Sequence, residues 1–241
     1  MEKVEWAWVV MGKPEQMSQW RSHWKAFYSK LHIINNQPGD TYGQAGSNRY
    51  FEFSGYLEAI DLFQTEGPFI LCNDTWFKTH NMSLWTLLLQ RFLRNSPKAD
   101  DIFGDLRTEL SNFIEKPSPY LSSWIFFIPN REILEQFRNC LQNAIREAVV
   151  ADFSKEYLDY VEDWIRPKNP FYGWHIQSNQ IESIERKRRC IYIEHRWNAW
   201  LLKEGFELCS FGSTQKYLYG LVRIIDRLQT RLFAWGLHPF A

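Results

Sequence analysis

The chain has 241 residues and a mass of 29.0 kDa, which suits one large domain or two small ones. Apolar residues make up 45% and charged residues 23%, so the composition excludes wholesale disorder. Lys plus Arg equals Asp plus Glu, at 28 each, whereas a general nucleic-acid-binding protein normally has a basic excess. We therefore expect no nucleic-acid partner. Aromatic residues reach 17%, and such side chains line carbohydrate and nucleotide sites as well as cores.

The cysteines and the N-terminus point to a cytoplasmic protein. The four cysteines are widely spaced and form no CxxC pair, which argues against a zinc ribbon and for reduced, packed thiols. The first residues, MEKVEWAWVVMGK, lack a small-residue cleavage site and are typical of a first buried strand. No stretch approaches about 18 uninterrupted apolar residues, so we expect no membrane-spanning helix.

Strands and helices alternate along most of the chain. Apolar runs and helically spaced segments follow in the order strand 6–10, helix 17–28, strand 31–34, loop 37–48, helix 50–63, strand 69–72, helix 83–93, strand 122–129, and helices 131–150, 157–165 and 191–202. Residues 178–189 are polar and charged, and we expect a solvated loop or helix face there. The alternation predicts an open α/β sheet with helices on both faces and ligands at the carboxyl ends of its strands.

The loop before the second helix predicts a phosphate site. Asn48 and Arg49 stand at a loop-to-helix junction, where free backbone N–H groups and the helix dipole favour phosphate. Arg49 can add a bidentate contact to a diphosphate. Glu52, Ser54 and Gly55 follow on the first turns, and Gly55 allows close approach of a ligand or strand. The alternative is a capped helix with Glu52 near its positive end, which the pattern alone favours.

The strand over residues 69–72 ends in polar residues at the edge where α/β enzymes bind ligands. Asp74 can hold Mg²⁺ or Mn²⁺, which take oxygen ligands and often bridge to substrate phosphates. Asn73 can add a carbonyl oxygen or bind a ribose hydroxyl. The alternative is that Asp74 simply caps the helix that follows.

The order of these motifs resembles that of bacterial polysaccharide-building glycosyltransferases, of the rhamnan-synthesis, capsule and O-antigen type. The NRxxExSG-like loop (NRYFEFSG) and the strand ending in NDT support the resemblance, which covers roughly two thirds of the chain. It implies a GT-A-like open, mostly parallel sheet over residues 1–210, followed by a C-terminal amphipathic helix or tail over residues 211–241. It also implies a nucleotide-sugar donor, with Mg²⁺ or Mn²⁺ on Asp74 and donor contacts from Asn48, Arg49, Glu52, Ser54, Gly55, Asn73, Asp74 and Thr75.

Two later segments resemble the acceptor and base regions of the same family. PYLSSWIFFIPNREIL resembles the acceptor-side strand, with Ser122 and Ser123 in the place of a QS-like pair. YIEHRWNAWLLKEGFEL resembles the region that supplies the base in inverting members, with Glu194 at a helix start and His195 beside it. The resemblance makes both Glu194 and His195 candidate catalytic residues. Arg196 and Trp197 would then anchor a diphosphate or stack on a sugar on the acceptor side. From the pattern alone, Glu194 is an N-terminal charge of an amphipathic helix.

The tail over residues 216–235 combines an apolar stripe with arginines at four-residue spacing. Such a helix either lies in a membrane interface or docks on the domain core, and the sequence leaves both open. Because the family often acts on lipid-linked acceptors, the first alternative implies peripheral attachment to the inner face of the cytoplasmic membrane.

These features favour a glycosyltransferase, of hexosyltransferase type, that moves a sugar from a nucleotide-sugar to a growing surface glycan such as lipopolysaccharide or capsule, with inversion. The main alternative is a non-catalytic protein that binds a carbohydrate or a partner on the same fold, because Cys72 replaces the first carboxylate of the usual DxD motif. A third is a metal-dependent nuclease or phosphatase that uses Asp74, Glu52 and Asp61. Neutral charge and the lack of a second carboxylate-bearing strand disfavour it.

Overall fold

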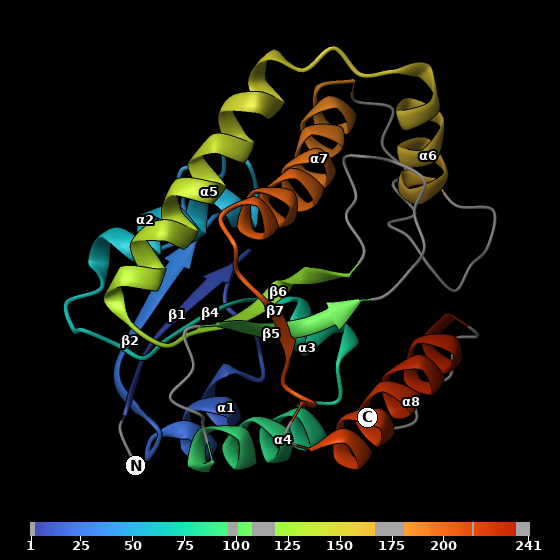
Figure 1. Ribbon diagram of the computed structural model, residues 1–241. Coiled ribbons are helices and arrows are strands. Elements are labelled where there is room, and N and C mark those ends of the chain that lie inside the picture. Colours follow the sequence, from blue (N-terminus) through green and yellow to red (C-terminus); the bar gives the residue numbers. More distant parts are fainter. Residues whose placement is uncertain (1–2, 96–100, 108–118, 167–180, 214, 235–241) are drawn as a thin grey trace.

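The computed structural model describes residues 3–95, 101–107, 119–166, 181–213 and 215–234, which form one mixed sheet with helices on both faces (Figure 1). The strands are β1 (Val4–Val10), β2 (Tyr28–Asn35), β3 (Gln44–Ala45), β4 (Phe69–Asn73), β5 (Ile102–Arg107), β6 (Tyr120–Ile128) and β7 (Leu208–Ser210). Their order is β3-β2-β1-β4-β6-β5-β7. Strands β1 to β4 are parallel, and β6 runs antiparallel to both of its neighbours.

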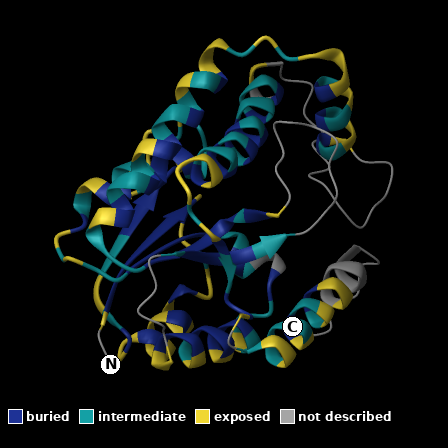
Figure 2. Ribbon diagram, in the orientation of Figure 1, coloured by how far each residue is buried: buried dark blue, intermediate teal, exposed yellow. Residues whose placement is uncertain are grey.

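Two groups of helices cover the two faces of the sheet (Figures 1 and 2). One face packs on α2 (Glu52–Leu62), α5 (Arg131–Val150) and α7 (Ile181–Lys203), and α6 (Lys155–Ile165) lies against α7. The other face packs on α1 (Met17–Trp24), α3 (Thr75–Thr79), α4 (Met82–Arg94) and α8 (Lys216–Ala234). No helix in the described part of the chain is long and apolar enough to cross a membrane.

Strand β1 lies inside the sheet, between β2 and β4, and is buried on both faces along its whole length. A parallel strand covered on both sides needs a continuous apolar sequence, which VEWAWVV supplies. Trp6 and Trp8 point to the α1 side and pack edge-on against Trp20, with ring centroids 4.9 and 5.2 Å away. Most of the high tryptophan content therefore fills the core, since eight of the tryptophans are among the fully buried side chains.

The open α/β architecture agrees with the sequence prediction, but several elements differ. The short strands β3, β5 and β7 were not expected, because they lack a long apolar run. Helix α7 begins at Ile181, ten residues before the predicted start at 191, so residues 181–189 are not a loop. Lys187 in that segment is buried instead of solvated.

Gly55 sets the distance between α2 and β1. A Cβ built on Gly55 would lie 2.4 Å from Cγ1 of Val9, which is closer than carbon atoms pack. The glycine thus lets α2 approach the central strand, and the helix start at Glu52 is held against the sheet edge.

We predict that Gly55→Ala lowers the free energy of unfolding by up to about 2 kcal/mol. Overpacking of this kind typically costs about 1–3 kcal/mol and outweighs the roughly 1 kcal/mol gain in helix propensity. Gly220→Ala in α8 is the matched control, because a Cβ there meets nothing within 4 Å. Denaturant unfolding of both variants measures the difference. Equal stabilities would contradict the close packing of α2 on β1.

Candidate functional site

The start of β6 extends beyond the end of β4, and this overhang organises the candidate site. The last paired residues of the two strands are Cys72 and Ile125, so Leu121 and Ser123 have no strand partner on the β4 side. Buried backbone N–H and C=O groups nevertheless need hydrogen bonds. Side chains from α2 and α7 supply them, which brings polar groups from distant parts of the chain to the carboxyl end of β4.

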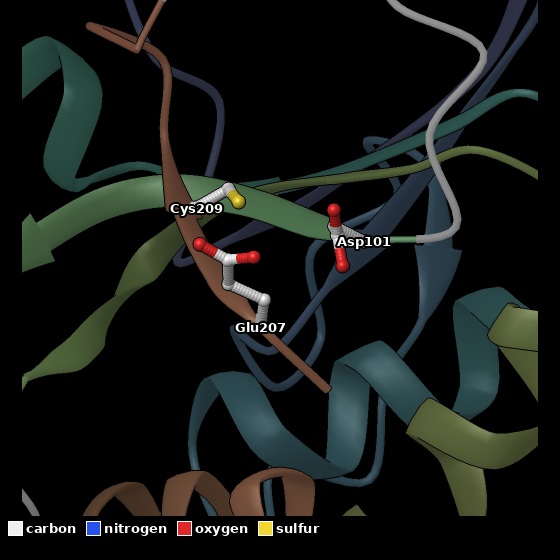
Figure 3. A group of neighbouring side chains, drawn as sticks. All are labelled: Asp101, Glu207 and Cys209. Carbon is white, nitrogen blue, oxygen red and sulfur yellow. The ribbon is translucent and has the colours of Figure 1, made fainter. Parts of the chain in front are cut away.

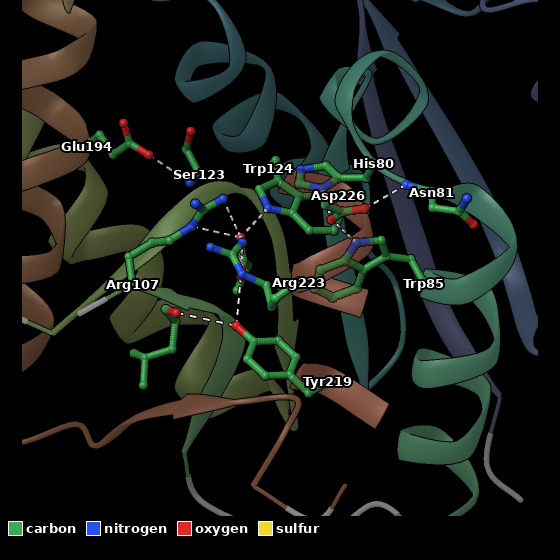
Figure 4. A network of polar contacts seen from close by, with 12 residues as sticks. His80, Asn81, Trp85, Arg107, Ser123, Trp124, Glu194, Tyr219, Arg223 and Asp226 are labelled. Atoms are coloured by element: carbon green, nitrogen blue, oxygen red, sulfur yellow. Dashed lines mark hydrogen bonds and ion pairs between the residues drawn. The ribbon is translucent and has the colours of Figure 1, made fainter. Parts of the chain in front are cut away.

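Asn198 and Glu194 of α7 bind the overhanging strand one after the other. Asn198 Oδ1 accepts from the Leu121 N–H at 2.8 Å, and its Nδ2 donates to the Leu121 carbonyl at 3.0 Å. Glu194 Oε1 accepts from the Ser123 N–H at 2.9 Å (Figure 4). The two side chains are one helical turn apart, so they match alternate residues of a strand. Glu194 thus lies in the middle of α7 and not at a helix start, which corrects the sequence prediction.

Helix α2 completes the cluster around Ser123. The Ser123 hydroxyl donates to Glu52 Oε1 at 3.1 Å, and the Tyr56 hydroxyl donates to the Ser123 carbonyl at 2.6 Å. Asn73, at the end of β4, lies 3.5 Å from the same carbonyl through Nδ2. Two carboxylates predicted for different roles, Glu52 and Glu194, therefore share one serine. Both residues are half-buried.

Lys187 is a member of this cluster that the sequence did not reveal. It lies two turns before Glu194 on α7 and is 4% exposed, close to the charges of Glu194 and Glu52. Its Nζ is 5.3 Å from the ring centroid of Phe51. Burial lowers the pKa of the Lys187 ammonium, and the nearby carboxylates oppose that shift. Lys187 and Glu194 are seven residues apart, which places them on one face of a helix. The predicted helix began at residue 191, so this spacing could not be used.

The environment of Glu194 favours proton acceptance. Burial raises the pKa of its carboxyl above the ordinary value, and the charge of Glu52 adds to the rise, while the hydrogen bond from the Ser123 N–H opposes it. A general base works best when its pKa lies near the operating pH, and burial beside a second carboxylate is a common way to reach this. Glu194 is therefore the best-placed base among the described residues of the site.

Asp74 lies at the same edge, directly after β4. Its Oδ2 accepts from the Met11 N–H at 3.3 Å, at the end of β1, and its side chain makes no capping hydrogen bond to α3. Asn73 Oδ1 accepts from the Thr75 N–H at 3.0 Å instead. Asp74 therefore occupies the N-cap position of α3, but its side chain does not make the capping hydrogen bond.

Cys72 belongs to the opposite face of the sheet. Its sulfur accepts from the Trp6 indole N–H at 2.9 Å within the apolar core, and burial raises the pKa of the thiol well above its usual range. Because side chains alternate along a strand, the cysteine does not share the ligand-facing side of its neighbour Asn73. Of the predicted motif, Asp74 is thus the carboxylate that can hold a metal ion, and Mg²⁺ is often bound through one or two carboxylates plus substrate phosphates.

The loop before α2 has strained backbone. Asn48 has φ 49°, and Phe51 has φ 47° and ψ −127°, conformations that cost non-glycine residues about 1–3 kcal/mol each. Asn36 Nδ2 holds the Phe51 carbonyl at 2.9 Å, and Arg186 of α7 lies over the Phe51 ring at 4.5 Å. Arg49 is exposed and lies over the Tyr50 ring. Strain of this kind concentrates at ligand sites, and this loop is next to the Ser123 cluster.

The remaining predicted donor residues support the loop from behind. The Ser54 hydroxyl accepts from the Tyr50 N–H at 3.2 Å and donates to the Phe51 carbonyl at 3.1 Å. Gly55 packs on Val9. Both residues shape the start of α2, whereas Asn48, Arg49 and Glu52 are the more open ones.

Of the four consecutive residues 194–197, only Glu194 reaches Ser123, because successive side chains of a helix point in different directions. His195 is buried beside the rings of Tyr157 and Tyr160. Arg196 forms an ion pair with Glu147 of α5 at 2.6 Å, and Trp197 is buried in the core, where no sugar can stack on it. Ser122 is half-buried and alternates with Ser123 along β6, so the two serines face opposite sides of the sheet.

A second polar network lies on the other side of β6 and fixes α8 (Figure 4). Buried Asp105 of β5 accepts from the Trp124 indole at 3.0 Å and the Tyr219 hydroxyl at 2.8 Å, and it pairs with Arg107 and Arg223 at 2.7 and 2.9 Å. Burial alone would raise the pKa of Asp105, but the Arg107 and Arg223 guanidiniums hold it below its usual value.

Asp226 is a second buried carboxylate that holds α8 in place. It pairs with His80 Nδ1 at 2.7 Å and accepts from the Asn81 N–H and the Trp85 indole. His80 also stacks on Trp124, with ring centroids 4.0 Å apart. The tail helix is therefore docked on the sheet and on α3 and α4.

Asp101, Glu207 and Cys209 form a separate group, in which one ligand atom from each residue lies within 4.8 Å of the others (Figure 3). The group lies where β5 and β7 begin, at the edge away from Asp74. Burial and the two carboxylates raise the pKa of Cys209 to about 11, which disfavours a thiolate ligand. We assign no metal to it.

Comparison with protein-family models, curated proteins and solved structures found no significant match for this chain.

We predict that Glu194→Gln stabilises the protein at about pH 7–8 and that this gain disappears towards pH 4.5. A carboxyl whose pKa is raised by folding contributes its full stability only below its unfolded pKa, and this contribution is lost as the pH rises through the folded pKa. Glutamine is neutral throughout and still accepts from the Ser123 N–H. Melting temperatures across this pH range measure the difference.

Glu185→Gln, at an exposed ion pair on the same helix, is the control and should show no such trend. A Glu194→Gln protein that is less stable at every pH would instead make Glu194 a structural carboxylate.

Proposed function

We propose that the protein is a glycosyltransferase that moves a sugar from a nucleotide-sugar to a hydroxyl of a glycan acceptor, with inversion at the anomeric carbon. The observation that supports this most is the cluster of Glu194, Ser123 and Glu52 at the same sheet edge as Asp74. A base with a raised pKa and a carboxylate suited to a metal-diphosphate are the two groups that such a reaction needs.

The proposed roles follow from the positions of these groups. Glu194 takes the proton of the acceptor hydroxyl as its oxygen attacks the anomeric carbon, and the bond from that carbon to the diphosphate oxygen breaks. Glu52 and Ser123 hold the base in place, and Lys187 offsets the two neighbouring negative charges. A Mg²⁺ or Mn²⁺ ion on Asp74 would neutralise charge on the leaving diphosphate.

The donor diphosphate would lie between Asp74 and the strained loop at residues 48–51. Arg49 is exposed there, and Arg186 approaches the same loop from α7, with Nη1 3.4 Å from the Asn48 carbonyl. Two guanidiniums near a helix start form a suitable environment for a diphosphate. The parallel order β3-β2-β1-β4 with an antiparallel β6 is compatible with the GT-A-like arrangement that the sequence resembles.

The competing functions have less support. The non-catalytic alternative depended on Cys72, but this residue faces the core on the other side of the sheet and does not replace a ligand there. The nuclease or phosphatase alternative required Asp61 beside Glu52. Asp61 is instead exposed near the far end of α2 and pairs with Arg138 at 2.5 Å.

We predict that Asp74→Ala abolishes stabilisation by the cognate nucleotide while the protein stays folded, because the half-buried Asp74 side chain contributes little to packing. A thermal-shift screen of UDP, GDP, CMP and dTDP with and without Mn²⁺ identifies that nucleotide. Asp61→Ala is the control and should retain the full shift. A nucleotide shift that is unchanged in Asp74→Ala would remove Asp74 from the donor site.

We predict that Glu194→Gln lowers turnover by about 10²–10⁴-fold, because glutamine keeps the hydrogen bond to Ser123 but cannot take a proton. Nucleotide affinity should change little, since the base contacts the acceptor, and this combination indicates lost transition-state stabilisation. Turnover, nucleotide affinity and melting temperature are measured on the same preparation, with Glu185→Gln as control. Turnover near that of the wild type in a folded Glu194→Gln protein would shift the search for the base to Glu52.

A further inference from the structure

Helix α8 docks on the core through a face that contains both apolar and charged residues, and it leaves a second apolar face exposed. The docked face contains buried Val222 and Asp226, and Arg223, which pairs with Asp105. The outward face presents a row of large apolar side chains, Tyr217 (94% exposed), Leu221 (49%), Ile224 (56%) and Leu228 (51%). We call these four residues the α8 stripe. In water a helix normally buries its apolar side, so this arrangement suggests that the α8 stripe meets another apolar phase.

The spacing of the α8 stripe makes it continuous. Its members are separated by four, three and four residues, which places them in one line along the helix. They account for four of the nine large hydrophobic residues exposed in the described part of the chain, although α8 is only one of its helices. Single exposed apolar residues need no explanation, but a row of them on one helix does.

The charges beside the α8 stripe indicate what covers it. Lys216 and Arg227 are exposed, whereas the one acidic residue of the helix, Asp226, is buried against His80. The outward side of α8 is therefore apolar and basic without a described acidic group. That combination complements the interface of an anionic bilayer, where apolar side chains enter the headgroup boundary and bases contact lipid phosphates.

A second copy of the chain fits the α8 stripe less well. A stable interface between proteins usually has about 20–30 residues on each side, and the α8 stripe offers four. A lipid surface requires no complementary partner of that size, because binding scales with apolar area and with attraction to anionic headgroups.

We propose that α8 attaches the protein peripherally to anionic membranes through the α8 stripe, while its opposite face remains fixed to the sheet by the Asp105 and Asp226 networks. Asp105 contacts Trp124, and Trp124 is adjacent in β6 to Ser123 of the candidate site. Attachment through α8 thus holds that edge of the sheet near the lipid surface. The proposal does not depend on the reaction that takes place there.

The experiment is a co-sedimentation assay of the full chain with vesicles of phosphatidylcholine alone or mixed with phosphatidylglycerol. We expect binding to the mixed vesicles that weakens as salt is added, because surface attraction is screened. The variant Leu221→Ser/Ile224→Ser/Leu228→Ser should bind at least about tenfold more weakly, since it removes most of the apolar area. Point variants are preferred to a deletion, which would leave Asp105 without Arg223.

The control is Val150→Ser/Leu202→Ser, which removes exposed apolar residues from α5 and α7 and should bind as the wild type does. Lys216→Glu/Arg227→Glu should reduce binding to mixed vesicles and abolish its salt dependence. The proposal is overturned if the wild type does not bind mixed vesicles, or if the triple serine variant binds them equally well. It is also overturned if size measurements show a dimer that the triple variant dissociates, because the α8 stripe would then be a subunit interface.

Discussion

The candidate site depends on the need to satisfy the backbone of β6 where it extends beyond β4. Leu121 and Ser123 have no neighbouring strand on that side, and an unsatisfied buried amide or carbonyl is costly. Asn198, Glu194 and Tyr56 provide the hydrogen bonds. The same contacts that complete the sheet therefore draw α2 and α7 together and place two carboxylates on one serine. The side chains that satisfy the backbone of β6 are thus also the candidate chemical groups.

The alternation of side chains along β6 divides this edge of the sheet into two polar networks. Ser123 faces Glu52 and Glu194, whereas Trp124 faces Asp105 and His80 on the other side. The first network includes a carboxylate with a raised pKa, and the second holds a carboxylate with a lowered pKa between two arginines. The first environment suits proton transfer, while the second suits permanent pairing. The second network holds α8 on the sheet through the contacts of Asp105 and Asp226.

The charge balance around Ser123 favours function over stability. Lys187 is buried close to the charges of Glu52 and Glu194, so each charge depends on the others. Groups held in this way seldom contribute much net stability, because desolvation offsets their attraction. Together with the strained backbone at Asn48 and Phe51, this cluster concentrates energetic cost at the edge where ligands bind in α/β sheets.

Apolar periodicity and turn residues are local signals, and they were enough to predict the open α/β class, the buried inner strands and the polar residues Asn73 and Asp74 at a strand end. The motifs also singled out Glu52, Ser123 and Glu194, although for separate roles. The packing of distant segments was needed to show that these three residues meet, that Lys187 joins them, and that Trp197 is a core residue. Which residues of a helix face the site depends on the rotation and axial position of the helix against its neighbours. For α7 that register is set by the Asn198 contact to β6, a pairing across 77 positions that no local pattern contains.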